Sequence, residues 1–210
     1  MCGIFGFIGE WGQLPDPDLL RVAAREASSR GPHAWGVVSL QGGALEWTKG
    51  RGPLGKALER ELQLPESSLV LGHARLATTR YGAAQDLLQV QPLLDLDETV
   101  ALAHNGTIKD PETIRYFHDL PPARTGNDSE VLLQLLAADL PLRPEALMKA
   151  LYAVGGDVVA HAAVAISRDG AMVAASTGQP LYRVRRPEGS YICSRPLGYA
   201  TRVETWSGRL

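Results

Sequence analysis

The order of strand-like and helix-like segments limits the fold of this chain of 210 residues more than any other feature. Apolar segments typical of strands lie at 2–9, 35–40, 44–49, 69–77, 99–106, 158–167, 171–176, 180–184 and 190–194. Helical patterns lie at 16–31, 110–120, 127–138 and 144–154. The strands come in hairpin-like runs with the helices grouped between them. This order favours largely antiparallel sheets with helices on their outer faces over alternating β and α units.

The helix at 16–31 has the clearest sequence signals. Asp16 can accept hydrogen bonds from the first free backbone N–H groups, and Pro17 suits the first helical position. Gly31 follows the end of the apolar pattern, where helices often terminate.

Composition indicates one globular domain spanning residues 1–210. Hydrophobic residues make up 45% and charged residues 21%, and a net charge of -2 gives no reason to expect a nucleic-acid partner or an anionic membrane. No apolar stretch approaches the roughly 18 residues of a membrane span, and no targeting segment is visible. The two cysteines make no disulfide framework, so we expect a reducing cytoplasm.

Cys2 directly follows the initiator methionine, and two interpretations of it remain open at this point. Cys2 can be one more small buried residue that begins a strand. Alternatively, removal of Met1 before this small side chain would leave a thiol and a free α-amine on one residue. An α-amine titrates at about 7.7–8.0, so it can accept the thiol proton near neutral pH.

Five short blocks favour the second interpretation when they are taken in order. They are "MCGIFGFIG" at 1–9, "SRGPHAWG" at 29–36, "GHARLATT" at 72–79, "AHNGTI" at 103–108 and "NDSE" at 127–130. Their order and separations resemble the glutaminase domain of class II glutamine amidotransferases, which are N-terminal nucleophile (Ntn) hydrolases. "QVQPLL" at 89–94 and the strands "GQPLYRV" and "SYICS" extend the resemblance over nearly the whole chain. The resemblance implies an α+β fold, a four-layer αββα sandwich of mostly antiparallel sheets.

The resemblance also implies the catalytic groups. Cys2 would be the nucleophile, with its own α-amine as the base, directly or through one water. Asn105, through its side-chain amide, and Gly106, through its backbone N–H, would hold the tetrahedral oxyanion. Taken alone, "HNG" would indicate a turn.

A free amino acid must be held at both ends, and the resemblance implies two residues for this. Arg75 would bind the α-carboxylate of glutamine, because a guanidinium can hold a carboxylate through two hydrogen bonds. Asp128 would bind the α-ammonium group. Asp128 or Asn127 can instead cap the helix that follows, and Arg75 can be an ordinary surface arginine.

The remaining predictions concern the surroundings of this site. We expect Arg30 to order the N-terminus, and Thr78 and Thr79 to lie in a loop that closes over glutamine. We expect His73 and His104 to be structural and Cys193 to be buried and inert. No Cys/His spacing indicates a metal site, and no glycine pattern indicates a dinucleotide cofactor. His33, Leu76, Asn127 and Thr79 depart from residues that are common in the family at these positions.

We therefore expect a cysteine-dependent glutamine amidohydrolase that releases glutamate and ammonia. No synthase domain is recognisable in the sequence, so we expect ammonia to pass to a separate synthase subunit that carries the acceptor site. Two alternatives remain. One is an amidase of the same fold that acts on another γ-glutamyl compound or small amide. The other is a catalytically silent glutamine-binding subunit, which retention of Met1 would favour.

Overall fold

The computed structural model describes residues 1–60, 62–77 and 86–210, and the fold contains two antiparallel sheets. The larger sheet has seven strands in the order β11-β9-β10-β1-β4-β2-β3. Their bounds are β1 Gly3–Gly9, β2 Ala34–Gln41, β3 Ala44–Arg51, β4 Leu69–Arg75, β9 Tyr182–Arg186, β10 Gly189–Cys193 and β11 Thr201–Arg202. β1 therefore lies at the centre of this sheet, between β10 and β4.

The smaller sheet has five strands in the order β12-β8-β7-β6-β5. Their bounds are β5 Leu93–Leu94, β6 Val100–Asn105, β7 Ala162–Ser167, β8 Ala171–Ser176 and β12 Thr205–Arg209. All pairings in both sheets are antiparallel.

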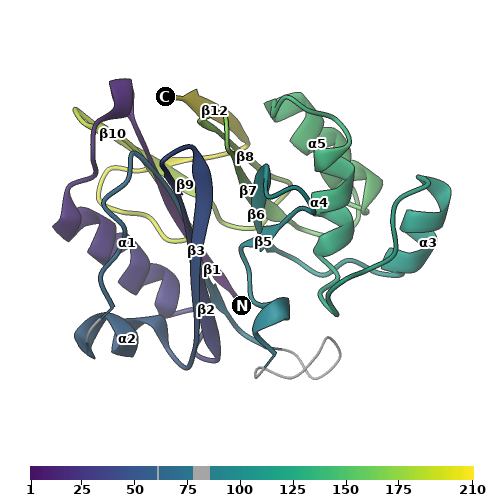
Figure 1. Cartoon of the computed structure of the whole chain (residues 1–210), viewed down its shortest axis with the longest axis horizontal. Helices are drawn as coiled ribbons and strands as arrows, with labels where there is room; N and C mark the ends of the chain where they lie inside the picture. Colours follow the sequence, from purple (N-terminus) through teal and green to yellow (C-terminus); the bar gives the residue numbers. More distant parts are fainter. Residues whose placement is uncertain (61, 78–85) are drawn as a thin grey trace.

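Helices cover the outer face of each sheet (Figure 1). The helices are α1 Pro17–Ser28, α2 Leu54–Arg60, α3 Pro111–Phe117, α4 Glu130–Ala137 and α5 Pro144–Ala153, with short 3-10 helices η1 Glu10–Gly12 and η2 Leu87–Gln89. Three separate apolar cores lie between the layers. One packs α1 and α2 against the larger sheet, one joins the two sheets, and one packs α4 and α5 against the smaller sheet. The expected four-layer αββα arrangement is confirmed.

Local sequence explains why α1 begins where it does and lies so close to β1. The Asp16 carboxylate accepts hydrogen bonds from the N–H groups of Asp18 and Leu19, at 2.9 and 3.2 Å. A Cβ atom at Gly3 would lie only 2.1 Å from the carbonyl oxygen of Ala27 in α1. The missing side chain thus lets the helix approach the first residue of the strand and fixes the position of the N-terminus.

The structure differs from the sequence-based expectation at a few element ends. β7 begins at Ala162, whereas we expected it to begin at residue 158, and α4 begins at Glu130 rather than at Asn127. β12 was not expected, because its alternating polar residues have the exposure pattern of a sheet edge rather than a buried strand. Among the described residues, none of the helices combines the length and the apolar character that crossing a membrane requires.

Candidate active site

The candidate site lies where the two sheets meet at one end. β1 and β4 run antiparallel with Gly3 opposite Ala74, so the start of β1 lies beside the end of β4. β6 of the second sheet ends at Asn105. A cavity of about 300 Å³ opens between these strand ends. Six of the residues that line it decide its chemistry: Cys2, Arg75, Gln91, Asn105, Gly106 and Asp128.

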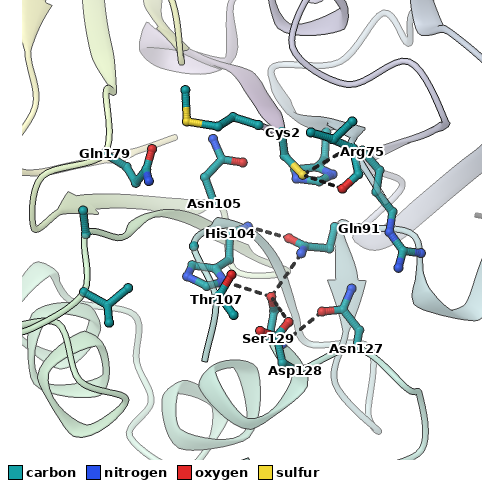
Figure 2. A pocket seen from close by; sticks show the side chains of 16 residues that line it. Cys2, Arg75, Gln91, His104, Asn105, Thr107, Asn127, Asp128, Ser129 and Gln179 are labelled. Atoms are coloured by element: carbon teal, nitrogen blue, oxygen red, sulfur yellow. Dashed lines mark hydrogen bonds between the residues drawn. The ribbon is translucent and has the colours of Figure 1, made fainter. Parts of the chain in front are cut away.

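Five of the predicted site residues therefore line one cavity although they are far apart in the sequence. They are Cys2, Arg75, Asn105, Gly106 and Asp128. Figure 2 shows Cys2 and Arg75 on one side of it and Asp128, with its neighbours, on the opposite side. Thr78 and Thr79, which we expected in a loop over glutamine, lie outside the described residues.

The Cys2 sulfur is held by the backbone that follows β4. Leu76 donates its N–H to Sγ at 3.3 Å, and the thiol donates to the Leu76 carbonyl at 3.7 Å. Burial raises the pKa of this thiol, while the Leu76 N–H and the nearby positive charges of the N-terminus, Arg75 and Arg30 oppose the shift. The thiol therefore needs a base before it can attack a carbonyl carbon.

Arg30 lies next to the N-terminus, as we expected from the sequence. Its Nε donates to the Cys2 carbonyl at 2.8 Å, and a terminal nitrogen approaches the Met1 sulfur at 3.7 Å. Met1 itself lines the cavity. The first two residues are thus held with the Cys2 side chain and the chain terminus both close to the cavity.

Asn105 and Gly106 lie at the end of β6, directly across from the nucleophile candidate. Asn105 Nδ2 donates to Ser194 Oγ at 3.0 Å, and Ser194 Oγ also accepts the Ile4 N–H at 2.9 Å. This hydrogen bond orients the amide and uses one of its two N–H groups, so the second can serve a ligand. Ser194 is a site residue that the sequence did not reveal, because a serine after an apolar strand carries no signal of its own.

Arg75 is buried, and a glutamine side chain holds it. A terminal nitrogen of Arg75 donates to Gln89 Oε1 at 3.3 Å, and Gln89 Nε2 donates to Asp86 Oδ2 at 3.2 Å. Burial lowers the pKa of Arg75, and Cys2, Asp128 and Asp86 oppose this. An arginine stays charged under these conditions, so the cavity contains a fixed cation.

Asp128 does not cap the following helix. The Ile108 N–H donates to its Oδ2 at 2.7 Å, whereas Ser129 is the N-cap residue of α4 and makes no side-chain cap. Burial raises the pKa of Asp128, and backbone N–H groups oppose the shift. The carboxylate therefore faces the segment after Gly106, on the side of the cavity opposite Cys2.

The residues that we expected to be structural are buried. Burial lowers the pKa of His73 to about 3 and that of His104 well below its usual range, so both rings are neutral. Cys193 is buried against α1, and burial raises its pKa to about 11, as expected for an inert thiol.

His33, one of the departures from the family pattern, has a clear local role. Its Nδ1 accepts the Ala77 N–H at 2.9 Å, and its own N–H donates to the Arg75 carbonyl at 3.0 Å. An unprotonated imidazole nitrogen is an acceptor here, as an acidic or amide side chain would be. His33 therefore supplies the acceptor for the Ala77 N–H in this chain.

Gln89 and Gln91, both in the segment "QVQPLL", make contacts near the cavity that the sequence did not predict. Gln91 accepts the His104 N–H at 2.5 Å and donates to Ser129 Oγ at 3.1 Å, while Gln89 holds Arg75. Gln89 ends η2 and Gln91 lies between η2 and β5, so neither side chain belongs to a regular pattern that could have predicted its position. Among the described residues, no three His, Cys, Asp or Glu side chains are arranged to hold a metal ion.

Comparison with known proteins identifies the family. No family model matches the chain. A glutamine–fructose-6-phosphate aminotransferase of Chlamydia muridarum is 30% identical over 146 residues, which are 66% of this chain and 22% of that protein. An amidophosphoribosyltransferase of Lacticaseibacillus casei is 30% identical over 141 residues, which are 64% of this chain and 70% of that sequence. The chain belongs to the class II glutamine amidotransferases.

The fold agrees with this family. The glutamine phosphoribosylpyrophosphate amidotransferase of B. subtilis has the same Ntn-hydrolase fold, with a TM-score of 0.74, 21% identity and coverage of 99% of this chain and 49% of that one. The chain thus spans about a fifth to about a quarter of the first curated amidotransferases that it matches, between 22% and 28% of their lengths.

Proposed function

We propose that this class II amidotransferase domain hydrolyses L-glutamine to glutamate and ammonia, with Cys2 as the nucleophile. The observation that carries the proposal is that Cys2, Arg75, Asn105, Gly106 and Asp128 line one cavity. The cavity, of about 300 Å³, falls at the lower end of the range of small-molecule sites, about 300–1,000 Å³.

Two fixed charges fit the ends of a free amino acid. The Arg75 guanidinium would bind the α-carboxylate, and Asp128 would bind the α-ammonium group, so that the side-chain amide extends toward Cys2. Each charge of the substrate would thereby meet an opposite charge that the protein has already partly desolvated. A small amide without both charged groups would leave one of these two charges without an opposite charge from the ligand, which disfavours the small-amide form of the alternative amidase. A γ-glutamyl compound keeps both groups and is distinguished from glutamine only by kinetics.

Catalysis in this proposal requires removal of Met1. The Cys2 α-amine takes the thiol proton, and Sγ attacks the amide carbon of glutamine. Asn105 Nδ2–H and the Gly106 N–H hold the oxygen that becomes negative. The C–N bond then breaks, the amine returns the proton to the leaving group, and ammonia departs. Water hydrolyses the thioester, which releases glutamate and restores the thiol.

The test of this function uses protein whose intact mass shows that Met1 has been removed. A glutamine-analogue electrophile, 6-diazo-5-oxonorleucine, should label Cys2 in peptide mapping, and Cys2→Ala should abolish glutamine hydrolysis while the protein remains folded. Cys193→Ala is the matched control and should retain activity. Labelling of Cys193 instead, or hydrolysis by Cys2→Ala, would refute the assignment.

We further propose that the released ammonia passes to an acceptor site on a separate synthase subunit in the cytoplasm. The names of the relatives support transfer of the amino group, because they describe amino or amido transfer to an acceptor. Glutamine hydrolysis by the isolated domain should then be slow and rise severalfold with the partner and its acceptor. Full activity of the domain alone, with no partner recovered from the native source, would instead favour a free-standing glutaminase.

A further inference from the structure

Two buried imidazole rings, those of His104 and His161, pack against the backbone of Gly106. A Cβ atom at Gly106 would lie 2.3 Å from His161 Nδ1 and 2.6 Å from His104 Nε2. Only the absence of a side chain lets both rings reach the backbone at this position. The Gly106 peptide, which the proposed function assigns to the oxyanion hole, is therefore in contact with a pair of histidines.

The two rings form one hydrogen-bonded unit. His104 Nε2 and His161 Nδ1 are 2.9 Å apart, and the ring planes are stacked with an angle of 28° between them. The other nitrogen of His104, Nδ1, lies 2.8 Å from Ser129 Oγ. Gln91 accepts the His104 N–H and donates to Ser129 Oγ (Figure 2). The His104 residue is therefore held at its backbone and at both ring nitrogens.

This chain of hydrogen bonds ends at the carboxylate proposed to bind the substrate ammonium. Ser129 Oγ lies 3.5 Å from Asp128 Oδ1. When Ser129 donates to ionised Asp128, His104 Nδ1–H is the donor to Ser129 and His161 Nδ1–H is the donor to His104 Nε2. His161 Nε2 is then a bare acceptor, and it is buried with no hydrogen-bond partner among the described residues. Burial lowers the pKa of both histidines, which keeps the pair neutral.

We propose that His104 and His161 are positioning residues that hold the Gly106 N–H toward the developing oxyanion, and that Ser129 connects them to Asp128. The inference rests on the proposed function and extends it to residues outside the catalytic set. Both imidazoles pack against the Gly106 backbone, and His104 also lines the cavity. Loss of their hydrogen bonds should therefore lower kcat and leave KM nearly unchanged, because the oxyanion forms only during the reaction.

The experiment compares His161→Leu with His161→Asn, two replacements of similar size that differ in polarity. Asn can still hydrogen-bond to His104 Nε2, whereas Leu cannot. We expect kcat for glutamine to fall about tenfold or more in His161→Leu, with recovery in His161→Asn and an unchanged KM in both. Alkylation of Cys2 by iodoacetamide, a displacement that needs no oxyanion hole, should proceed at the wild-type rate in both variants.

Ser129→Ala gives the same test at the other end of the hydrogen-bond chain, where Ser129 contacts His104 Nδ1. This variant decides the question if His161→Leu does not fold. It should also lower kcat, whereas the exposed control His118→Leu should behave as wild type. Equal kcat values for wild type and a folded His161→Leu, or for wild type and Ser129→Ala, would overturn the inference. A wild-type protein that lacks Met1 and does not hydrolyse glutamine would instead overturn the proposed function itself.

Discussion

Asp128 carries a charge that the fold does not favour. Burial raises its pKa, so above the pKa of the unfolded chain, about 3.9, ionised Asp128 reduces the stability of the folded state. Its Ile108 hydrogen bond offsets part of this cost. A ligand ammonium would offset more, which is consistent with a carboxylate kept for binding rather than for folding.

Asp128→Asn separates these two roles. The amide oxygen can still accept the Ile108 N–H, while the buried charge is lost. We expect weaker glutamine binding and reduced discrimination against analogues that lack the α-amine, measured as kcat/KM for each compound. The thermal midpoint at pH 7 should stay equal or rise, and this gain should disappear below pH about 4, where the wild-type carboxyl is protonated in both states. Unchanged kinetics together with a lower midpoint would show a purely structural role.

Arg75 can be tested by a change that keeps its charge. Arg75→Lys retains a cation but loses the planar fork and the contact to Gln89. We expect kcat/KM for glutamine to fall at least about tenfold, which corresponds to about 1.4 kcal/mol. An arginine that takes no part in binding glutamine would tolerate this replacement, so kinetics within twofold of wild type would contradict the assignment.

At the scale of elements, the end of β4 connects the substrate site to β2. His33, just before β2, bonds the backbone on both sides of Leu76, and Leu76 in turn holds the Cys2 sulfur. A hydrogen bond of this kind contributes about 0.5–1.5 kcal/mol. The segment after Arg75 is thus held in place from the neighbouring strand.

His33→Ala should therefore loosen the Leu76 backbone and lower kcat/KM about three- to tenfold. His33→Asn keeps a side-chain acceptor and should retain most of the activity. Because His33 is exposed, the thermal midpoint should change little in either variant. Equal loss in the alanine and asparagine variants would show that the hydrogen bond to Ala77 is not the cause.

The sequence predicted those elements whose pattern comes from burial. β1, β4 and β6 are apolar on both faces, and α1 has a capping residue and a proline at its start, so their existence and type followed from local physics. β12 did not, because its pairing with β8 depends on a distant strand and its own residues are half exposed. The same reason hid His161 and Ser194: their partners at Gly106 and Asn105 lie 55 or more positions away in the sequence.

At the scale of the whole molecule, the position of the nucleophile depends on the packing of one layer on the next. α1 contacts β1 at Gly3, next to Cys2, and Arg30 just beyond α1 bonds the Cys2 carbonyl. A shift of α1 would therefore move the start of β1 and also Arg30, which donates a hydrogen bond to the Cys2 carbonyl. The geometry of the site is set by the contact between these two layers.

Gly3→Ala should destabilise the protein by about 2 kcal/mol through overpacking, and it should lower kcat because Cys2 moves. Chemical denaturation and glutamine kinetics measure the two effects. Gly55→Ala is the control, since its Cβ would meet Ser28 Oγ at an ordinary 3.4 Å and alanine favours the helix. Wild-type stability in Gly3→Ala would mean that α1 can retreat from the sheet without cost.

Because Met1 lines the cavity, the way in which this protein is produced should decide whether it works at all. Any residue left in front of Cys2, such as the remnant of a cleaved affinity tag, would occupy space meant for substrate and would convert the α-amine into an amide that cannot take a proton. A tag after Leu210 avoids both problems, because the C-terminus lies beside β12 and apart from the N-terminus (Figure 1). We expect preparations with a carboxy-terminal tag and complete removal of the initiator to be active, and those with an amino-terminal extension to be silent whatever their purity.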